Sequence, residues 1–305
     1  MDYTVEQIGA KMDALGVWDR LYGCHWALKP RGSAFPYFCA VLPGEKPPVK
    51  IRLMLLDGWQ TFHDFLRTRA DRSFGFYSSP MEMPHFELVL LADGAMKLFR
   101  HDPCYLPCEA DPARLAFCAK MLWEVYGVMM RVEGDPRVPM MYAAEQAVFS
   151  RVEGPDGRWS DRPLPLVQPR PHVEKIVFSK ADIAKAKDLP FASGDQLSVD
   201  FRLRLGVITR EPRPRVCYCL VGVNPKTSVR EIFAQVSPNP EGGLRALWEE
   251  MPAQFLKRLI ALGTIPGEVR VCSQRVYRML RPLIVELPFR LSMNSSLPEI
   301  EAQFR

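Results

Sequence analysis

The sequence predicts a two-domain protein that combines the α+β and α/β fold classes, and three observations lead to this prediction. The chain has 305 residues, which exceeds the size that one hydrophobic core usually serves. Hydrophobic residues make up 48% and charged residues 25%, proportions typical of a folded globular protein. Prolines crowd residues 134–194, which we interpret as an ordered connector between an N-terminal α+β domain (1–133) and a C-terminal α/β domain (195–305).

The N-terminal domain is expected to begin with a helix that is followed by an antiparallel meander. Thr4 and Gln7 form a capping-box pattern, and Gly16 can end the helix in the left-handed region. Turns rich in Gly and Pro then separate three apolar runs, which is typical of neighbouring strands. The strands expected from these runs lie at residues 25–30, 36–42 and 49–56.

The rest of this domain is expected to cover and extend the sheet. Aromatic residues recur at helical spacing after Asp57, which predicts a helix whose aromatic stripe packs on the sheet. Asp93 and Gly94 stand between two apolar runs and predict a hairpin with a two-residue type I′ turn. Asp111 followed by Pro112 predicts the start of a long helix.

The connector and the C-terminal domain are also expected to contain regular elements. In the connector we expect strands near residues 147–153 and 173–178, and a short helix that Ser179 caps. The last third has the order β-β-β-α-β-α-β-α, which predicts a mixed, three-layer-like arrangement of a partly parallel sheet and helices. Pro252 and Pro282 should each kink or divide its helix, and Ser296 should cap the last helix.

Charge and cysteine usage limit the classes of partner and compartment. The net charge is +5, and residues 200–305 carry 16 basic against 10 acidic side chains, so the excess lies in the C-terminal domain. This excess is smaller than the dense basic footprint of most nucleic-acid-binding domains. The N-terminal residues show no signal-peptide pattern, no apolar run could span a bilayer, and the eight cysteines lie among apolar residues. We therefore expect a cytoplasmic protein without a membrane partner.

His101, Cys104 and Cys108 are the candidates for a metal site, because zinc takes imidazole and thiolate ligands. A structural zinc site needs a fourth ligand, which His85 or Cys118 would have to supply. The alternative is a rigid turn between prolines in which the cysteines only pack, and this is the interpretation we favour. No nucleotide-binding motif occurs either, so no cofactor is expected.

Acidic residues of the C-terminal domain suggest a second chemistry. The order of its elements is similar to the ribonuclease H-like fold, whose nucleases hold two metal ions on clustered carboxylates. Asp200 could supply one carboxylate and Glu249 or Glu250 another, but the fourth strand offers none. Because fewer than three converging carboxylates hold a divalent cation poorly, the resemblance implies at most a catalytically inactive relative.

Two stretches of the chain carry a further resemblance. The first is FRHDPCYLPCEADPARLAF, ahead of the long helix, and the second is ALGTIPGEVRVCSQRVYRMLRPLIVELPFRLSMNSSLPEIEAQF. Their spacing of turn residues and apolar runs resembles a bacterial family of two-domain proteins whose domains have no known function. Where such domains tend to have an acidic residue and a glycine in the first hairpin turn, residues 223–228 read VNPKTS. The resemblance implies an architecture and no activity.

A non-enzymatic interaction or regulatory protein with an unknown protein partner is therefore the function that we expect. The alternative is a nucleic-acid-associated protein that uses the basic C-terminal domain. Arg210, Arg213 and Arg215 form the densest basic cluster and could contact phosphate or an acidic partner, although a solvated loop is the simpler interpretation. An enzyme with an unrecognised pocket is the third possibility.

Overall fold

A computed structural model describes residues 3–70, 82–168, 175–204, 213–238 and 243–304 of the chain. The chain forms two compact units. Unit 1 comprises Met1–Leu66, Ser79–Asp102 and Pro107–Arg170, and unit 2 comprises Arg67–Ser78, Pro103–Leu106 and Pro171–Arg305. Among the described residues, no helix is both long and apolar enough to cross a membrane. The fold class is mixed α+β, as predicted.

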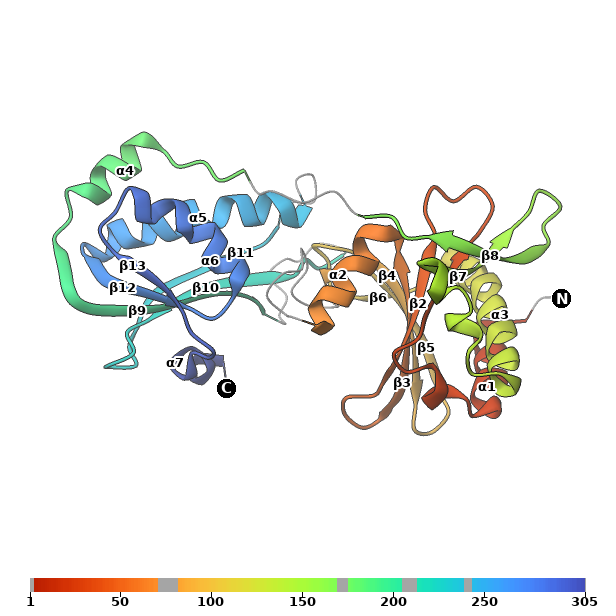
Figure 1. Cartoon of the computed structure of the whole chain (residues 1–305). Coiled ribbons are helices and arrows are strands. Elements are labelled where there is room, and N and C mark those ends of the chain that lie inside the picture. Colours follow the sequence, from red (N-terminus) through yellow and green to blue (C-terminus); the bar gives the residue numbers. More distant parts are fainter. Residues whose placement is uncertain (1–2, 71–81, 169–174, 205–212, 239–242, 305) are drawn as a thin grey trace. The chain divides into compact units, whose positions relative to one another are not determined.

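Unit 1 is an eight-stranded sheet with the strand order β6-β5-β4-β3-β2-β1-β7-β8 (Figure 1). All neighbouring strands are antiparallel except β1 and β7, which are parallel. The strands are β1 (His25–Lys29), β2 (Tyr37–Pro43), β3 (Val49–Asp57), β4 (His85–Leu91), β5 (Met96–His101), β6 (Cys108–Glu109), β7 (Ala147–Glu153) and β8 (Trp159–Pro165). The helical segments are α1 (Val5–Leu15), η1 (Trp18–Leu21), α2 (Gly58–Ala70), α3 (Pro112–Gly134), η3 (Val138–Met140) and η4 (Ala143–Glu145).

Helices cover both faces of this sheet. Helices α1 and α3 lie on one side and bury a core with side chains such as Ile8, Leu53 and Met121 (Figure 1). Helix α2 lies on the other side, where the ring of Phe62 stacks on the ring of Phe38 in β2 with 4.2 Å between centroids. The predicted aromatic stripe therefore packs on the sheet as expected, because helical spacing places its rings on one face.

Most local signals of unit 1 behave as predicted. The capping box of Thr4 and Gln7 is present, and Gly16 ends α1 with a φ of 62°. Asp111 caps α3 by accepting a hydrogen bond from the backbone N–H of Arg114. These interactions join residues only a few positions apart, so the local sequence decides them.

The β4–β5 hairpin corrects one prediction. The pairing of Leu90 with Met96, together with a hydrogen bond from Leu91 N to Ala95 O, leaves a loop of three residues instead of two. Gly94 has a φ of 85°, and Asp93 has no positive φ, so the turn is not type I′. A three-residue loop with glycine in the left-handed region is the other common hairpin connection, and it shifts the cross-strand register by one residue.

Unit 2 is a five-stranded sheet with the strand order β11-β10-β9-β12-β13. Strands β9 (Phe191–Arg204), β10 (Cys217–Val223) and β11 (Arg230–Val236) are antiparallel neighbours, whereas β12 (Ile265–Val271) and β13 (Arg290–Met293) run parallel to β9. Its helical segments are α4 (Lys180–Lys187), α5 (Gly243–Leu262), α6 (Gln274–Leu280), η5 (Arg281–Val285), α7 (Pro298–Glu301) and η6 (Ala302–Phe304).

The helices of unit 2 also lie on two sides of its sheet. Helices α5 and α6 cover one face, where Trp248 and Phe255 are buried against Val199 of β9. Helix α7 covers the other face, where Ile300 packs with Cys219 of β10 (Figure 1). Alternate residues of β9 therefore point toward different helices, because the side chains of a strand alternate between faces.

The expected features of unit 2 have different outcomes. Residues 173 and 174 lie outside the described residues, and residues 175–178 form no strand; the backbone N–H of Lys175 donates instead to the carboxylate of Glu249 in α5. Ser296 does not cap the last helix, whose N-cap is Leu297 without a side-chain bond. Helix α6 ends at Leu280, and Pro282 lies in the first turn of the 3-10 segment η5, as its missing N–H predicts. Helix α5, in contrast, continues through Pro252 and is not divided there.

Candidate functional site

The histidine cluster, as we call His85, Glu87 and His101, is the place in the described part of the chain where at least three metal-ligating side chains converge. His85 and Glu87 are two residues apart in β4, so they point to the same face of the sheet. His101 stands directly opposite His85 in β5 and shares that face. One ligand atom from each side chain lies within 4.8 Å of the other two.

The two imidazoles of the cluster stack on each other. Their ring centroids are 4.1 Å apart, with an interplanar angle of 17°. The Nδ1 atom of His85 lies 2.8 Å from the carbonyl oxygen of Met83, while its Nε2 atom is buried and finds no hydrogen-bond partner among the residues described. Burial in the first place, together with the neighbouring His101, lowers the pKa of His85 to about 3. His85 is therefore neutral at physiological pH and carries an unused lone pair on Nε2.

Glu87 is the charged member of the cluster. Its Oε2 atom lies 2.8 Å from Nε2 of His101, in a contact that lacks hydrogen-bond geometry, and its Oε1 atom accepts from Arg52 of β3. Burial raises the pKa of Glu87, but His101 and Arg52 outweigh burial and hold that pKa at about 2. The cluster thus combines an ionised carboxylate with a neutral imidazole in a buried setting.

An open groove of about 600 Å³ borders this cluster. Arg52, Glu87 and His101 contribute to its wall, and Lys46 and Lys97 lie along it. Because His101 and Glu87 are only 4% exposed, the groove reaches the edge of the cluster, and the centre of the cluster is buried.

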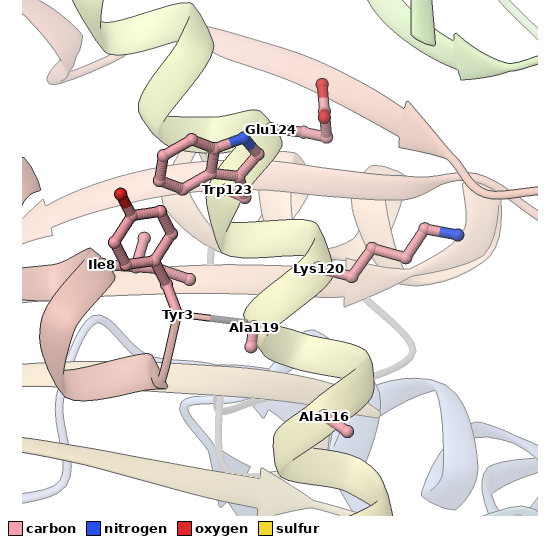
Figure 2. Close-up of a pocket in the computed structure, with 7 residues that line it drawn as sticks. All are labelled: Tyr3, Ile8, Ala116, Ala119, Lys120, Trp123 and Glu124. Atoms are coloured by element: carbon pink, nitrogen blue, oxygen red, sulfur yellow. The ribbon is translucent and has the colours of Figure 1, made fainter. Parts of the chain in front are cut away.

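A second pocket, of about 480 Å³, lies beside α1 and α3 (Figure 2). The rings of Tyr3 and Trp123 stack in its wall with 4.7 Å between centroids, and Lys120 and Glu124 supply its charges. Lys120 is already paired with Glu153, at 2.5 Å from Nζ to Oε1. The charged residues of this pocket therefore stabilise the packing of unit 1.

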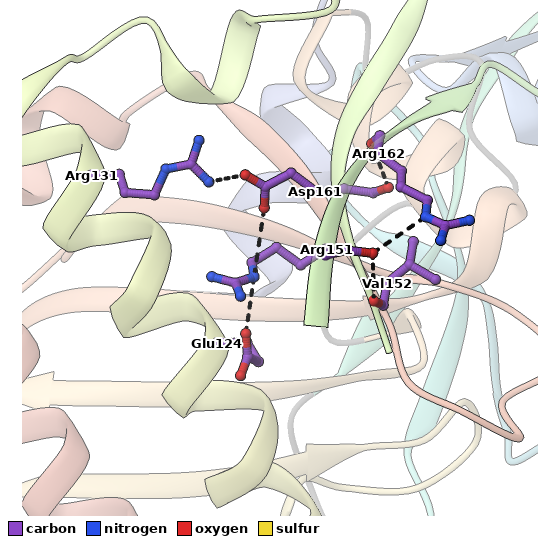
Figure 3. A network of polar contacts seen from close by, with 8 residues as sticks. Glu124, Arg131, Arg151, Val152, Asp161 and Arg162 are labelled. Carbon is purple, nitrogen blue, oxygen red and sulfur yellow. Dashed lines mark hydrogen bonds and ion pairs between the residues drawn. The ribbon is translucent and has the colours of Figure 1, made fainter. Parts of the chain in front are cut away.

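A network of ion pairs that includes Glu124 shows how such charged residues hold unit 1 together (Figure 3). Arg151 of β7 lies with its Nε atom 3.0 Å from Oε2 of Glu124 in α3 and 3.8 Å from Oδ1 of Asp161 in β8. Asp161 also pairs with Arg131 of α3. These charges tie the helix to the last two strands and neutralise one another.

The zinc candidates predicted from sequence do not form one group. His101 lies in the histidine cluster of unit 1, whereas Cys104 lies in the hydrophobic core of unit 2 and Cys108 lies in β6 of unit 1. Burial raises the pKa of Cys104 to about 11, so its thiol stays protonated. Sequence reasoning missed Glu87, although the spacing H-x-E in a strand places both side chains on one face.

The carboxylates predicted from sequence in unit 2 also lie apart. Asp200 of β9 is on the sheet face that α7 covers, because its neighbours Val199 and Phe201 point to the opposite core. Glu249 and Glu250 belong to α5, which covers that opposite face. Glu249 accepts from Arg245 and from Lys175 N, and Glu250 accepts from Gln254.

Asp200 has a different set of partners. Arg202, two residues further along β9, donates from its guanidinium to Asp200 Oδ2, with 2.7 Å from Nε, and its Nη2 atom also donates to Glu301 Oε1 at 3.0 Å. The other oxygen of Asp200 accepts from the backbone N–H of Phe201 at 2.8 Å. An arginine therefore stands between the two acids.

The basic cluster is engaged internally where the structure describes it. Arg210 lies outside the described residues. The guanidinium of Arg213 lies over the ring of Tyr105, 4.4 Å from its centroid, and Arg215 donates to the carbonyl oxygen of Pro238. The two described arginines thus stabilise the segment around Tyr105.

Comparison with known proteins leaves the activity open and supports the family resemblance. No curated protein and no solved structure matches the chain. A family model matches residues 182–305, a stretch that takes in most of α4, all five strands and the later helices of unit 2. Residues 182–305 thus match the model of DUF6930, a domain of unknown function.

Proposed function

We propose that the chain is a non-enzymatic interaction protein. The observation that carries this proposal is the ion pair network in which Arg202 stands between Asp200 and Glu301. Asp200 is the acid that a metal-dependent nuclease of this topology would need on its central strand. In this chain the guanidinium of Arg202 pairs with the carboxylate of Asp200, where a metal ion would otherwise bind.

The geometry explains why a divalent cation would compete poorly at this place. Two nitrogens of the guanidinium donate to the same oxygen of Asp200, and hydrogen bonds between charged groups are stronger than those between neutral groups. A cation would have to displace the arginine and find further oxygen ligands. Glu299, the other acid of α7 on this face, already accepts a hydrogen bond from Ser198.

An edge of unit 2 offers a surface for a protein partner. Strand β13 pairs with β12 alone, so one side of its backbone has no strand neighbour in the sheet. Exposed apolar side chains accompany it: Val285 is 84% exposed, and Ile284 and Met293 are each 39% exposed. Exposed edge strands with apolar side chains are typical sites for an extended segment of another protein.

A nucleic-acid-associated protein with an inactive ribonuclease H-like domain is the second candidate. Its support is the order β9-β10-β11-α5-β12-α6-β13-α7, which repeats the element order from which the resemblance was inferred. Arg213 and Arg215 add no support, because both are engaged within unit 2.

The first candidate is tested by adding a tag to the chain in cells that naturally express it and identifying the proteins that co-purify with it. We expect one protein partner at a stoichiometric ratio, and we expect V285D to lose it because a carboxylate then replaces an exposed apolar side chain. V229D is the matched control, since Val229 is a valine of unit 2 that is 56% exposed and precedes β11 at the other end of the sheet.

Three outcomes would contradict or redirect this proposal. Cleavage of RNA or DNA by the purified chain with Mg²⁺ or Mn²⁺ would overturn the non-enzymatic function. A partner that V285D retains would rule out the β13 edge as its binding surface. Nucleic acid that co-purifies and leaves with increasing salt, as counterion release requires, would favour the second candidate.

A further inference from the structure

We propose that His85, Glu87 and His101 bind a divalent transition metal ion of the zinc class in unit 1. This site is independent of the function proposed above, which rests on unit 2. Two imidazoles and one carboxylate form a ligand set that suits zinc and its first-row neighbours, whereas magnesium and calcium prefer oxygen ligands alone.

His85 is arranged as ligating histidines usually are. Its Nδ1 atom is 2.8 Å from the carbonyl oxygen of Met83, so Nδ1 carries the proton and donates it to that carbonyl. This tautomer leaves a lone pair on Nε2, which is buried and has no hydrogen-bond partner in the part of the chain that the structure describes. Buried polar atoms nearly always have a partner, and a bound ion would supply one here.

His101 and Glu87 complete the ligand set. Among the described residues, Nδ1 of His101 has no hydrogen-bond partner, and its Nε2 atom lies 2.8 Å from Oε2 of Glu87. Arg52 holds the other oxygen of Glu87, as an outer residue does when it orients a ligating carboxylate. Ligands of one zinc ion lie about 3 to 4 Å apart, so modest side-chain rotations bring these atoms, now within 4.8 Å, onto one ion.

The surroundings allow an ion to enter and stay. Glu87 and His101 line the groove of about 600 Å³, which gives an ion and a water molecule, as a fourth ligand, a route from solvent. The competing interpretation is an ion pair of Glu87 with Arg52 in which both histidines only pack.

Metal titration of the full chain distinguishes these interpretations. After treatment with a chelator, we expect calorimetry to show one equivalent of Zn²⁺ bound per chain. We expect E87Q, which keeps the shape of the side chain, and H85F, which keeps an aromatic ring, each to weaken zinc affinity about tenfold or more. H63Q is the matched control, because His63 is in unit 1 but outside the cluster, and it should bind zinc as the unaltered chain does.

Absorption of the Co²⁺-loaded unaltered chain gives a readout that needs no variant. We expect visible bands of a site with nitrogen and oxygen ligands, and no thiolate charge-transfer band. A thiolate band would assign the ion to cysteines such as Cys104 or Cys108 and would overturn the proposal. Absence of zinc binding by the unaltered chain, or binding that a folded E87Q variant retains unchanged, would also overturn it.

Discussion

Replacing Arg202 by glutamine should strongly destabilise unit 2. The side chain of Asp200 is 7% exposed and that of Arg202 is 24% exposed, so R202Q leaves a nearly buried carboxylate without its countercharge. Breaking one partner of a buried ion pair costs about 3 to 5 kcal/mol. Because the guanidinium keeps some contact with water, we expect the lower end of that range, about 3 kcal/mol.

Removing the second charge should relieve this cost. In the double variant D200N/R202Q both groups are neutral and can still hydrogen-bond, so stability should return to within about 1 kcal/mol of the parent. Glu301, the other partner of Arg202, has a side chain that is 51% exposed, so water can replace its contact.

Urea unfolding measures these differences, with the fluorescence of Trp248 as the probe. Trp248 is the one tryptophan of the sequence within unit 2, and phenylalanine at the other five tryptophans removes the signal of unit 1. A loss of less than about 1 kcal/mol in R202Q would refute the reasoning. So would a double variant that is no more stable than R202Q.

Three further predictions concern packing and thiol reactivity. G267A should lose about 1 to 3 kcal/mol in urea unfolding, because its methyl group would overlap a backbone carbonyl of β9, whereas G194A, with no atom within 4 Å, should unfold like the parent. F38A should lose about 3 to 5 kcal/mol in urea unfolding of unit 1, since that ring is fully buried, and a loss below about 1 kcal/mol would contradict this packing. Cys118 should resist iodoacetamide at pH 8 in the folded chain, as its burial raises its pKa to about 12, and mass spectrometry should find it alkylated only in urea.

Local signals predicted much of the fold. The capping box of Thr4 and Gln7, the cap at Asp111 and the end of α6 at Pro282 were all readable in the sequence. Each depends on a hydrogen bond, or its loss, between residues a few positions apart, so the surrounding fold changes it little.

Strand β8 shows where local signals mislead. Its residues Trp159–Pro165 include two prolines and are largely exposed, so the stretch reads as part of a connector. In the structure it is the edge strand next to β7, a position where proline is tolerated because one side of the backbone has no ladder to complete. Strand β7 pairs with β1, which lies far from it in sequence, and this pairing places β8 at the edge of the sheet.

The histidine cluster depends on a register that the dipeptide Asp93-Gly94 did not predict. A two-residue turn would have paired His85 with position 102, and His101 would then have pointed to the opposite face of the sheet. The three-residue loop pairs His85 with His101 instead. One residue of register thus decides whether the two imidazoles meet, because strand side chains alternate between faces.

The sequence by itself determined the mixed α+β class, most helix boundaries and the aromatic face of α2, because composition, periodicity and caps act over short distances. Only the tertiary structure decided which charged and ligating groups meet. Arg202 reaches Glu301 across 99 positions of sequence, and His101 meets Glu87 only through the β4–β5 register. Such contacts follow from strand pairing and helix packing between distant segments, and no local pattern encodes them.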